Sequence, residues 1–321
     1  MLNSFIFKKK SVTCNPTRQD LARALWDKEA LVWVDLENPS EFESEILIEL
    51  FNFHPLAIED CLSEMSESKI DDYEDHLFLI VHAINPKVRE ELGTIEVDIF
   101  VSKNYVVTFH KEPVPSVVQL RDGLQRKAEG SGFDSSDMLL HAVLDRLVDR
   151  YLSVITEQER KIDEIEDQVF VDGSKDFLPR ILKIQKDVLH LKRIINPQRE
   201  TINALSRNAY GLIKQKHLIY YRDIDDHLFR FYQMAEELHG LLTGIFQVYF
   251  SHVSAKLNEV IKTMTIIATI SLPPMVIASI YGMNFKFMPE LNWQWGFLFS
   301  LGLMTVSSGI VLIYMKFKKW F

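Results

Sequence analysis

Two asparagines that flank one uncharged run are the residues of this chain best suited to meet a metal cation. Asn258 lies shortly before the run, and Asn284 ends the tetrapeptide Tyr281-Gly282-Met283-Asn284 that closes it. No aspartate or glutamate lies within the run. Mg²⁺ gives up its water molecules reluctantly, so a neutral amide carbonyl can accept hydrogen bonds from those waters without removing them. We therefore predict that a ring of Asn284 side chains binds a hydrated divalent cation.

A helix through this run would separate small and hydroxyl-bearing residues from bulky ones. One stripe, at three- and four-residue steps, consists of Asn258, Ile261, Thr265, Ala268, Leu272, Met275, Ser279 and Gly282. The opposite stripe consists of Ile266, Ile267, Ile270, Pro273, Val276, Ile277 and Ile280. We expect lipid to cover the bulky stripe, and a neighbouring helix or an aqueous pore to face the small one. Packing between helices explains the small residues as well as a pore does.

If a pore is present, three apolar side chains are suited to control it. Met264, Leu272 and Met275 would form hydrophobic constrictions that gate by dewetting. Two spans in one chain cannot enclose a pore, so several copies must each contribute a helix. An inside-negative potential favours entry of a double charge by ~4.6 kcal/mol per 100 mV, twice the ~2.3 of a single charge. Because entry is then downhill, no ATP site is required.

Two uncharged runs are the elements that would place these residues in a membrane. Thr263–Met283 and Trp295–Met315 hold no charged residue, and each matches the ~20 residues of a helix that crosses ~30 Å of hydrocarbon. Basic residues flank the pair on one side only: Lys256, Lys262, Lys316, Lys318 and Lys319. The linker between the runs holds only Lys286 and Glu290. The positive-inside rule therefore predicts that both termini face the cytoplasm and that the linker faces out.

The rest of the chain has the composition of a soluble domain. The whole sequence has 321 residues, a net charge of −9 and two cysteines. Two cysteines are too few for a disulfide framework, which fits a reducing cytosol. The N-terminal segment is too short for a signal-peptide core, so we expect the soluble part to remain in the cytosol. No Walker-type phosphate loop or nucleophile–base pair stands out, and we expect neither an enzyme nor a nucleic-acid partner.

Residues 30 to about 115 alternate strand and helix signals. The predicted strands are Leu31–Leu36, Leu77–Ala83, Thr94–Val101 and Tyr105–Phe109, with a hairpin at 102–104 joining the last two. Ser40 and Glu43 have capping-box spacing at the start of a helix that would run to about Phe51. His54 precedes a short helix opened by Pro55, and we interpret it as a cap. The run Lys69–Asp75 is interpreted as a solvated helix start. An α/β domain with a mixed sheet follows.

From about Ser135 onward the pattern is helical. Helices are predicted over 137–169 and 177–207, and opposite charge on the two favours an antiparallel hairpin, although solvated faces explain the charges equally well. A third helix runs from Asp223 to Tyr281, interrupted only by Pro273 and Pro274. Its coiled-coil-like seam consists of Ile224, Leu228, Phe231, Ala235, Leu238, Leu242, Ile245, Tyr249 and Val253. Such a helix would couple the cytosolic part to the membrane.

These patterns divide the chain into seven segments. They are an α/β domain at 1–135, a helical hairpin at 136–222, a stalk helix at 223–262, a first transmembrane helix at 263–284, an external loop at 285–294, a second transmembrane helix at 295–315 and a basic tail at 316–321.

Several short motifs, taken in order, resemble the CorA family of magnesium transporters. They are Trp33-Val34-Asp35, His54-Pro55-Leu56-Ala57-Ile58-Glu59-Asp60, Lys69-Ile70-Asp71-Asp72-Tyr73, Tyr221-Arg222-Asp223, Asn258-Glu259-Val260, Tyr281-Gly282-Met283-Asn284 and Met288-Pro289-Glu290-Leu291. Together they cover nearly the whole chain. The resemblance implies an α+β membrane protein with a cytosolic α/β/α head, a long stalk helix that continues into the first of two transmembrane helices, and a homopentameric funnel.

The resemblance also implies residue roles. Gly282, Met283 and Asn284 would form the outer selectivity filter, Asn258 a polar ring at the cytoplasmic mouth, and Met264 and Leu272 hydrophobic gates. Thr265, Ala268, Met275 and Ser279 would line the pore between them, and Glu290 would lie in the external loop. The implied substrate is Mg²⁺, with Co²⁺ and Ni²⁺ as secondary substrates, in the inner (plasma) membrane.

A cytosolic Mg²⁺ site is implied as well. Asp223 matches an inter-subunit carboxylate that binds Mg²⁺ when the cytosolic concentration is high, and Asp145 and Asp149 are weaker candidates for a second site. The usual acidic partner of Asp223 is missing from Asn85-Pro86-Lys87. Carboxylates that face each other across a subunit interface repel when empty and attract through a shared cation. Bound Mg²⁺ would therefore hold the assembly closed.

Two alternatives remain at this point. One is a zinc transporter of the same superfamily, against which the methionine of Gly282-Met283-Asn284 argues. The other is a membrane-anchored cytosolic sensor whose two spans are only structural, against which the polar stripe and Asn284 argue.

Overall fold

The computed structural model describes residues 1–8, 11–63, 67–85, 92–126, 132–171, 177–284, 286, 288–289, 293–318 and 320. Contacts between Cα atoms divide the chain into two compact units. The first consists of Met1–Phe170 and Asp176–Ile245, and the second of Val171–Lys175 and Phe246–Phe321. One long helix contributes to both units.

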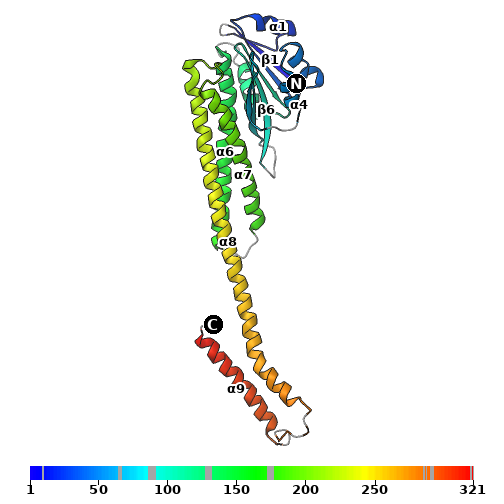
Figure 1. The fold of residues 1–321 in the computed structure, drawn as a ribbon, viewed down its shortest axis with the longest axis vertical. Helices are drawn as coiled ribbons and strands as arrows, with labels where there is room; N and C mark the ends of the chain where they lie inside the picture. The colour runs from blue at the N-terminus through cyan, green and yellow to red at the C-terminus, as the bar shows by residue number, and fades with distance from the viewer. Residues whose placement is uncertain are drawn as a thin grey trace. The chain divides into compact units, whose positions relative to one another are not determined.

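The first unit contains a mixed sheet, as predicted, in which the structure describes seven strands where four were predicted (Figure 1). The strands are β1 (Leu2–Lys8), β2 (Ser11–Cys14), β3 (Leu31–Glu37), β4 (Lys69–Asp72), β5 (Leu77–Asn85), β6 (Gly93–Val101) and β7 (Tyr105–His110). Their order in the sheet is β2-β1-β3-β7-β6-β5-β4. Only β3 and β7 pair in parallel, and the other neighbours are antiparallel. The alternating side chains of the strands give the sheet two faces, both of which are covered.

Short helices cover one face of the sheet. They are α1 (Arg18–Trp26), α2 (Glu41–Ser44), α3 (Ile46–Glu49) and α4 (Pro55–Leu62), and α5 (Pro115–Arg126) follows the last strand. Leu21, Leu47 and Ala57 from these helices pack with Val32 and Phe100 of the sheet in one buried cluster. This burial of apolar surface stabilises the head, at about 25 cal/mol per Å² removed from water.

The predicted helix caps are confirmed, but one predicted helix is shorter than expected. The Ser40 and Glu43 capping box forms at the start of α2, and the helix breaks at Glu45 into α2 and α3 instead of running to Phe51. His54 caps α4, because its Nδ1 accepts a hydrogen bond of 3.2 Å from the Leu56 N–H. The His54 side chain therefore caps the helix, as interpreted.

The prediction of a solvated helix start at Lys69–Asp75 is wrong. Residues Lys69–Asp72 form β4, which pairs antiparallel with Leu77–Ile80 of β5. The strand β5 is buried along its length, so its edge requires a hydrogen-bonding neighbour, and that tertiary demand overrides the local charge pattern. Lys69 forms ion pairs with Asp60 at 2.7 Å and Asp71 at 2.8 Å. The charges of this run thus neutralise one another at the edge of the sheet.

Three long helices complete the first unit and the last of them continues into the second. They are α6 (Ser136–Val171), α7 (Leu178–Ser206) and α8 (Leu218–Tyr281), and the second unit adds α9 (Gly296–Phe317). The helix α8 begins at Leu218, after a 3₁₀ turn at Gln215–His217, and not at Asp223 as predicted. Its predicted seam is buried from Ile224 to Tyr249, whereas Val253 is half-buried. The part from Ile224 to Ile245 belongs to the first unit, where α6, α7 and α8 lie side by side (Figure 1).

A buried glutamine joins the long helices to the sheet. The pairing of β4 with β5 extends only as far as Lys69 opposite Ile80, so the N–H of His82 in β5 lies beyond it. Gln198 of α7 replaces the missing strand, because its Oε1 accepts that N–H at 2.9 Å. Tyr151 of α6 donates its hydroxyl to the His82 carbonyl at 2.8 Å. One residue of the sheet is thereby tied to two long helices.

The start of α8 is anchored by a buried carboxylate at the start of α6. Asp137 accepts hydrogen bonds from the Lys214 N–H at 3.0 Å, from the His217 ring at 2.7 Å and from the Ser135 hydroxyl. Burial alone would raise the pKa of Asp137, but these donors outweigh it, and the net pKa is lowered. A carboxyl group with a lowered folded-state pKa stabilises the fold above its unfolded pKa of about 3.9, and this contribution is lost as the pH falls.

We expect Asp137→Asn to cost about 1–3 kcal/mol at pH 7, because the charged acceptor is lost while its donors stay buried. The thermal midpoint of the variant is expected to lie below that of the wild type at pH 7, and the difference should shrink as the pH falls below about 4. Asp134→Asn, an exposed neighbour, serves as the control and should leave the midpoint unchanged. A difference for Asp137→Asn that stays constant as the pH is lowered would contradict the argument.

Candidate cation-conducting site

The tetrapeptide that closes the first uncharged run forms the end of α8. The Gly282 N–H still donates to the Ala278 carbonyl at 2.9 Å, and the Met283 N–H donates to Ile280 at 3.2 Å. A Cβ at position 282 would lie 3.2 Å from the Ala278 oxygen, a tight contact that a larger residue could make only with a small shift of the neighbouring backbone. The helix ends at Tyr281, and Asn284 is exposed shortly after it.

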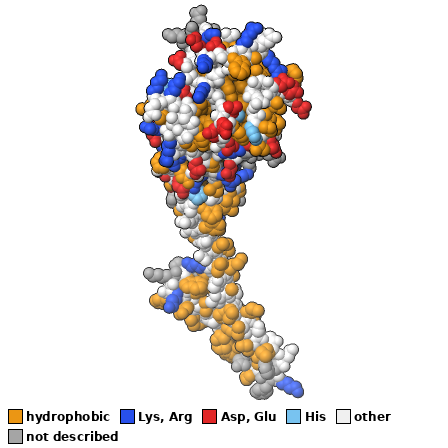
Figure 2. Space-filling model, turned by 45° about the horizontal axis from the view of Figure 1, so that its top comes forward, with side chains coloured by type: hydrophobic (Ala, Val, Ile, Leu, Met, Phe, Trp, Pro, Cys, Tyr) orange, Lys and Arg blue, Asp and Glu red, His pale blue; other side chains and the backbone are white. Residues whose placement is uncertain are grey.

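Two helices in the described part of the chain are long and apolar enough to cross a membrane. They are the helix that ends at Tyr281 and the helix Gly296–Phe317. Figure 2 shows hydrophobic side chains over the surface of the second unit, whereas Lys, Arg, Asp and Glu gather on the first. Exposed apolar surface of this extent is typical of a segment covered by lipid or by other protein chains.

The small stripe of α8 lies open within a single chain. Ile261, Leu272 and Met275 are 61%, 61% and 70% exposed, and Asn258, Ala268 and Ser279 are exposed as well. Thr265 is the half-buried member of the stripe, and its hydroxyl donates to the Ile261 carbonyl at 2.8 Å. The predicted gate residue Met264, beside the stripe, is 67% exposed. The face is therefore available to another helix or to water.

The expectation that lipid covers the whole bulky stripe is wrong in part. Its members Ile266, Ile270, Pro273 and Ile277 are half-buried. The helix α9 lies beside this part of α8 (Figure 1), and Ser308 of α9 bonds the Ile270 carbonyl at 3.3 Å. A second apolar helix of the same chain competes with lipid for this surface, and a bulky ridge packs well against it. The other members, Ile267, Val276 and Ile280, remain exposed.

The structure brings the three predicted cytosolic carboxylates into one acidic region. Asp145 and Asp149 lie on α6, and Asp223 lies on α8 with 64% of its side chain exposed. Burial raises the pKa of Asp149, and the negative charges of Asp145 and Asp223 raise it further. A shared cation would relieve this repulsion between carboxylates.

Two histidines of the same region were not predicted. His227 lies 3.9 Å from Asp223, and His141 is influenced electrostatically by both Asp145 and Asp223, which oppose the lowering of its pKa by burial. Each is four residues from an aspartate on the same helix, a spacing that places both side chains on one face and could have revealed them. Among the described residues, no group of three His, Cys, Asp or Glu side chains is arranged to hold a metal ion.

Glu290 of the predicted external loop lies outside the described residues, as do Pro86 and Lys87. Asn85 is described and buried, and its side-chain amide donates to Glu112 at 2.8 Å. Its side chain is therefore hydrogen-bonded within the head domain of its own chain.

The family profile described as CorA-like Mg²⁺ transporter protein matches residues 28–319. The chain belongs to the CorA-like family. The family is one of transporters and not an enzyme class, as predicted.

Individual CorA relatives cover most of the chain. The cobalt/magnesium transport protein CorA of Thermotoga maritima is 34% identical over 279 residues, which is 85% of this chain and 78% of that protein. YfjQ of Bacillus subtilis, provisionally described as a metal ion transporter, is 34% identical over 296 residues, covering 91% and 90% of the two chains. The complete structure of the CorA magnesium transporter from Methanocaldococcus jannaschii superposes with a TM-score of 0.86 at 19% identity over 100% of this chain and 99% of that one. The predicted mixed-sheet head, long helix and two candidate membrane helices are thereby confirmed, and the homopentamer stays a prediction.

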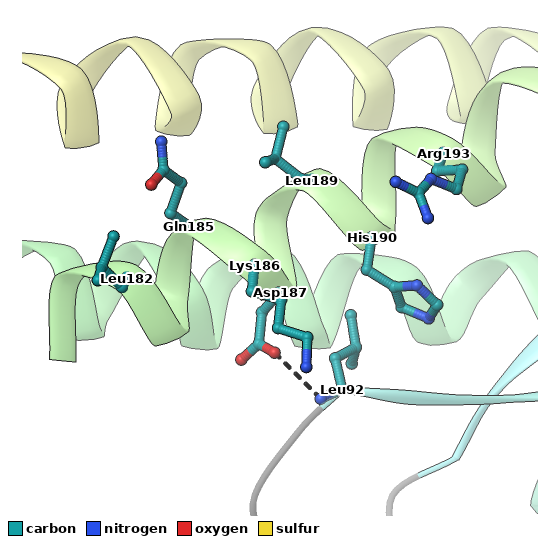
Figure 3. A pocket seen from close by; sticks show the side chains of 8 residues that line it. All are labelled: Leu92, Leu182, Gln185, Lys186, Asp187, Leu189, His190 and Arg193. Carbon is teal, nitrogen blue, oxygen red and sulfur yellow. Dashed lines mark hydrogen bonds between the residues drawn. The ribbon is translucent and has the colours of Figure 1, made fainter. Parts of the chain in front are cut away.

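A pocket of about 380 Å³ lies on α7, where hydrogen bonds join this helix to α6 and to the chain before β6. Figure 3 shows Asp187 and Leu92 joined by a hydrogen bond, with His190 and Arg193 further along α7. The Asp187 carboxylate accepts the Leu92 N–H at 3.1 Å and the Gln158 amide at 3.4 Å. These bonds tie the chain before β6 to α6 and α7.

Proposed function

We propose that this chain assembles with other copies into a channel that passes hydrated Mg²⁺ into the cytoplasm. The observation that carries the proposal is the stripe of α8, which α9 leaves uncovered and which ends at Asn284. In an assembly, the stripes of several copies would face one axis, and the Asn284 carbonyls would accept hydrogen bonds from the waters of the ion. Met264, Leu272 and Met275 would close the path by dewetting.

The finer features follow the family. We infer a pentamer with α8 lining the pore and α9 at its periphery, and the seven segments named above as its parts. Co²⁺ and Ni²⁺ would use the same path, because an amide ring binds the hydration shell and not the bare ion. Basic flanks at Lys262 and Lys316 favour cytoplasmic termini in the plasma membrane. The membrane potential would drive entry without ATP.

Uptake into liposomes tests this proposal. Purified protein in vesicles that contain a Mg²⁺ dye should admit Mg²⁺ faster when the interior is negative, and Co²⁺ should compete with it. Zn²⁺ uptake that depends on a pH gradient, without Mg²⁺ flux, would overturn the proposal in favour of a zinc transporter. No flux of either ion would favour a membrane-anchored sensor.

We further propose that Asp223 regulates the channel. Its exposed carboxylate, close to the charges of Asp145 and Asp149, would share a Mg²⁺ ion with the head domain of a neighbouring copy. At high cytosolic Mg²⁺ the shared ion would hold the copies together and the pore closed. Loss of the ion would leave like charges facing each other, and their repulsion would loosen the assembly.

Asp223→Ala is expected to weaken inhibition of uptake by internal Mg²⁺ by about tenfold in Mg²⁺ concentration, because one charged ligand is removed. Protection from protease by Mg²⁺ should weaken in parallel. Asp226→Ala is the matched control, since Asp226 is exposed on the same helix, and it should behave as the wild type. Unchanged inhibition and protection in Asp223→Ala would contradict the regulatory role.

A further inference from the structure

Two adjacent prolines leave the backbone of α8 incomplete inside its membrane-crossing part. Pro273 and Pro274 lie within the helix. Proline has no N–H, so the carbonyls four residues earlier, those of Thr269 and Ile270, lose their donors within the helix. Hydrocarbon offers no water to replace a lost donor. A hydroxyl group from a neighbouring helix can replace such a donor.

Ser308 of α9 supplies the donor that Pro274 lacks. Its hydroxyl oxygen lies 3.3 Å from the Ile270 carbonyl oxygen, and the bond joins two helices of the same compact unit. The other described hydroxyl bonds of these two helices in the membrane part stay within one helix. They are those of Thr263, Thr265, Thr269, Ser271, Ser300, Thr305 and Ser307. Ser308 thus differs from its neighbours in bonding across helices, at the carbonyl that Pro274 exposes.

We propose that Ser308 is a positioning residue that holds α9 against the proline pair of α8 and so sets the alignment of the pore wall. This proposal rests on the proposed channel function. A proline pair is a point at which a helix bends. The stripe from Asn258 to Leu272 lies before the pair, and its remaining part from Met275 to Gly282 lies after it. The hydrogen bond from Ser308 restrains the bend of α8 between these two parts of the stripe.

The need for the Ser308 donor can be removed without changing Ser308. Pro274→Ala restores an N–H that can donate to Ile270, so the helix no longer needs a donor from α9. The adjacent Ser307 is a matched control, because its hydroxyl donates to Met304 of its own helix at 3.0 Å. Ser308→Thr keeps a hydroxyl at the critical position.

The experiment compares the full-length wild type with S308A, S308T, S307A, P274A and S308A/P274A. Each is measured for its thermal midpoint in detergent and for Mg²⁺ uptake in liposomes. We expect S308A to lower the midpoint by about 1–3 °C, the size expected for one hydrogen bond between membrane helices. Uptake should fall roughly threefold, which corresponds to the average strength of such a bond. S308T and S307A should match the wild type.

The decisive comparison is the effect of S308A in the wild type against its effect in P274A. In P274A, the additional S308A substitution should change neither midpoint nor uptake, because Ile270 already has its own donor. An equal loss from S308A in both backgrounds, a similar loss from S307A, or no loss from S308A would overturn the proposal. If the wild type admits no Mg²⁺, the channel function fails while the thermal comparison still decides the role of Ser308.

Discussion

Asn284→Ala is expected to lower Mg²⁺ uptake by about 100-fold. Each copy in the assembly would lose one carbonyl that accepts a hydrogen bond from the waters of the ion, and hydrogen bonds involving charged species are worth about 1.5–3 kcal/mol. Asn284 is exposed at the end of α8 with no described side-chain partner, so its loss should not disturb the fold. The thermal midpoint is therefore expected to stay at the wild-type value, which separates loss of function from loss of structure.

Two further variants sharpen this measurement. Asn284→Gln keeps the amide on a longer side chain and should retain part of the uptake. Lys286→Ala removes a positive charge from the exposed linker and should leave uptake unchanged or raise it, because a cation near the mouth opposes cation entry. Uptake by Asn284→Ala at the wild-type rate would exclude this amide as the first ligand of the ion.

The second large effect is expected at Asp35, in the middle of the sheet. Its carboxylate is fully buried and accepts hydrogen bonds from Thr108 at 2.7 Å, His110 at 3.2 Å and Arg121 at 3.3 Å. Asp35 thereby joins β3 to β7 and both strands to α5. Asp35→Ala leaves the buried donors of Thr108 and His110 without this acceptor, while the half-buried Arg121 keeps Glu37. Two unpaired buried donors and the space left by the carboxylate would together cost about 3–5 kcal/mol.

The thermal midpoint of the Asp35→Ala variant is expected to fall by roughly 10 °C, since a unit of this size shifts by about 2–4 °C per kcal/mol. Glu37→Gln is the control, because Glu37 is the second carboxylate of Arg121 at 3.0 Å but is partly exposed. Glutamine keeps a carbonyl that can accept from Arg121, so Glu37→Gln should lower the midpoint by less than Asp35→Ala does. A similar fall for both variants would show that the network does not depend on the buried carboxylate.

Local patterns predicted the elements whose burial follows from one periodicity. The seam of α8 is an example, because apolar residues at three- and four-residue steps from Ile224 to Tyr249 leave a helix only one face to bury. The strands β3, β5, β6 and β7 were predicted for a similar reason, since they are rich in β-branched and aromatic residues and bounded by turns. The cap at His54 and the capping box at Ser40 were readable from spacing alone.

Elements that depend on distant partners were missed or misread. The strands β1 and β2 were not predicted; β1 pairs with β2 nearby and with β3 more than twenty positions along the chain. The charged run at Lys69 becomes a strand only because the edge of β5 needs a partner. The helices α1 and α5 are short, and their burial depends on the sheet that they cover.

The candidate site divides in the same way. The sequence by itself determined the two membrane-crossing helices, the neutral asparagines at the ends of the first one and the absence of carboxylates within it, because length, hydropathy and charge act locally. Only the tertiary structure decided which face of α8 remains open, that Asp145, Asp149 and Asp223 share one region with His141 and His227, and that Ser308 bonds the Ile270 carbonyl. Each of these depends on two helices meeting in space, and a contact between distant residues leaves no periodic signal in the sequence of either one.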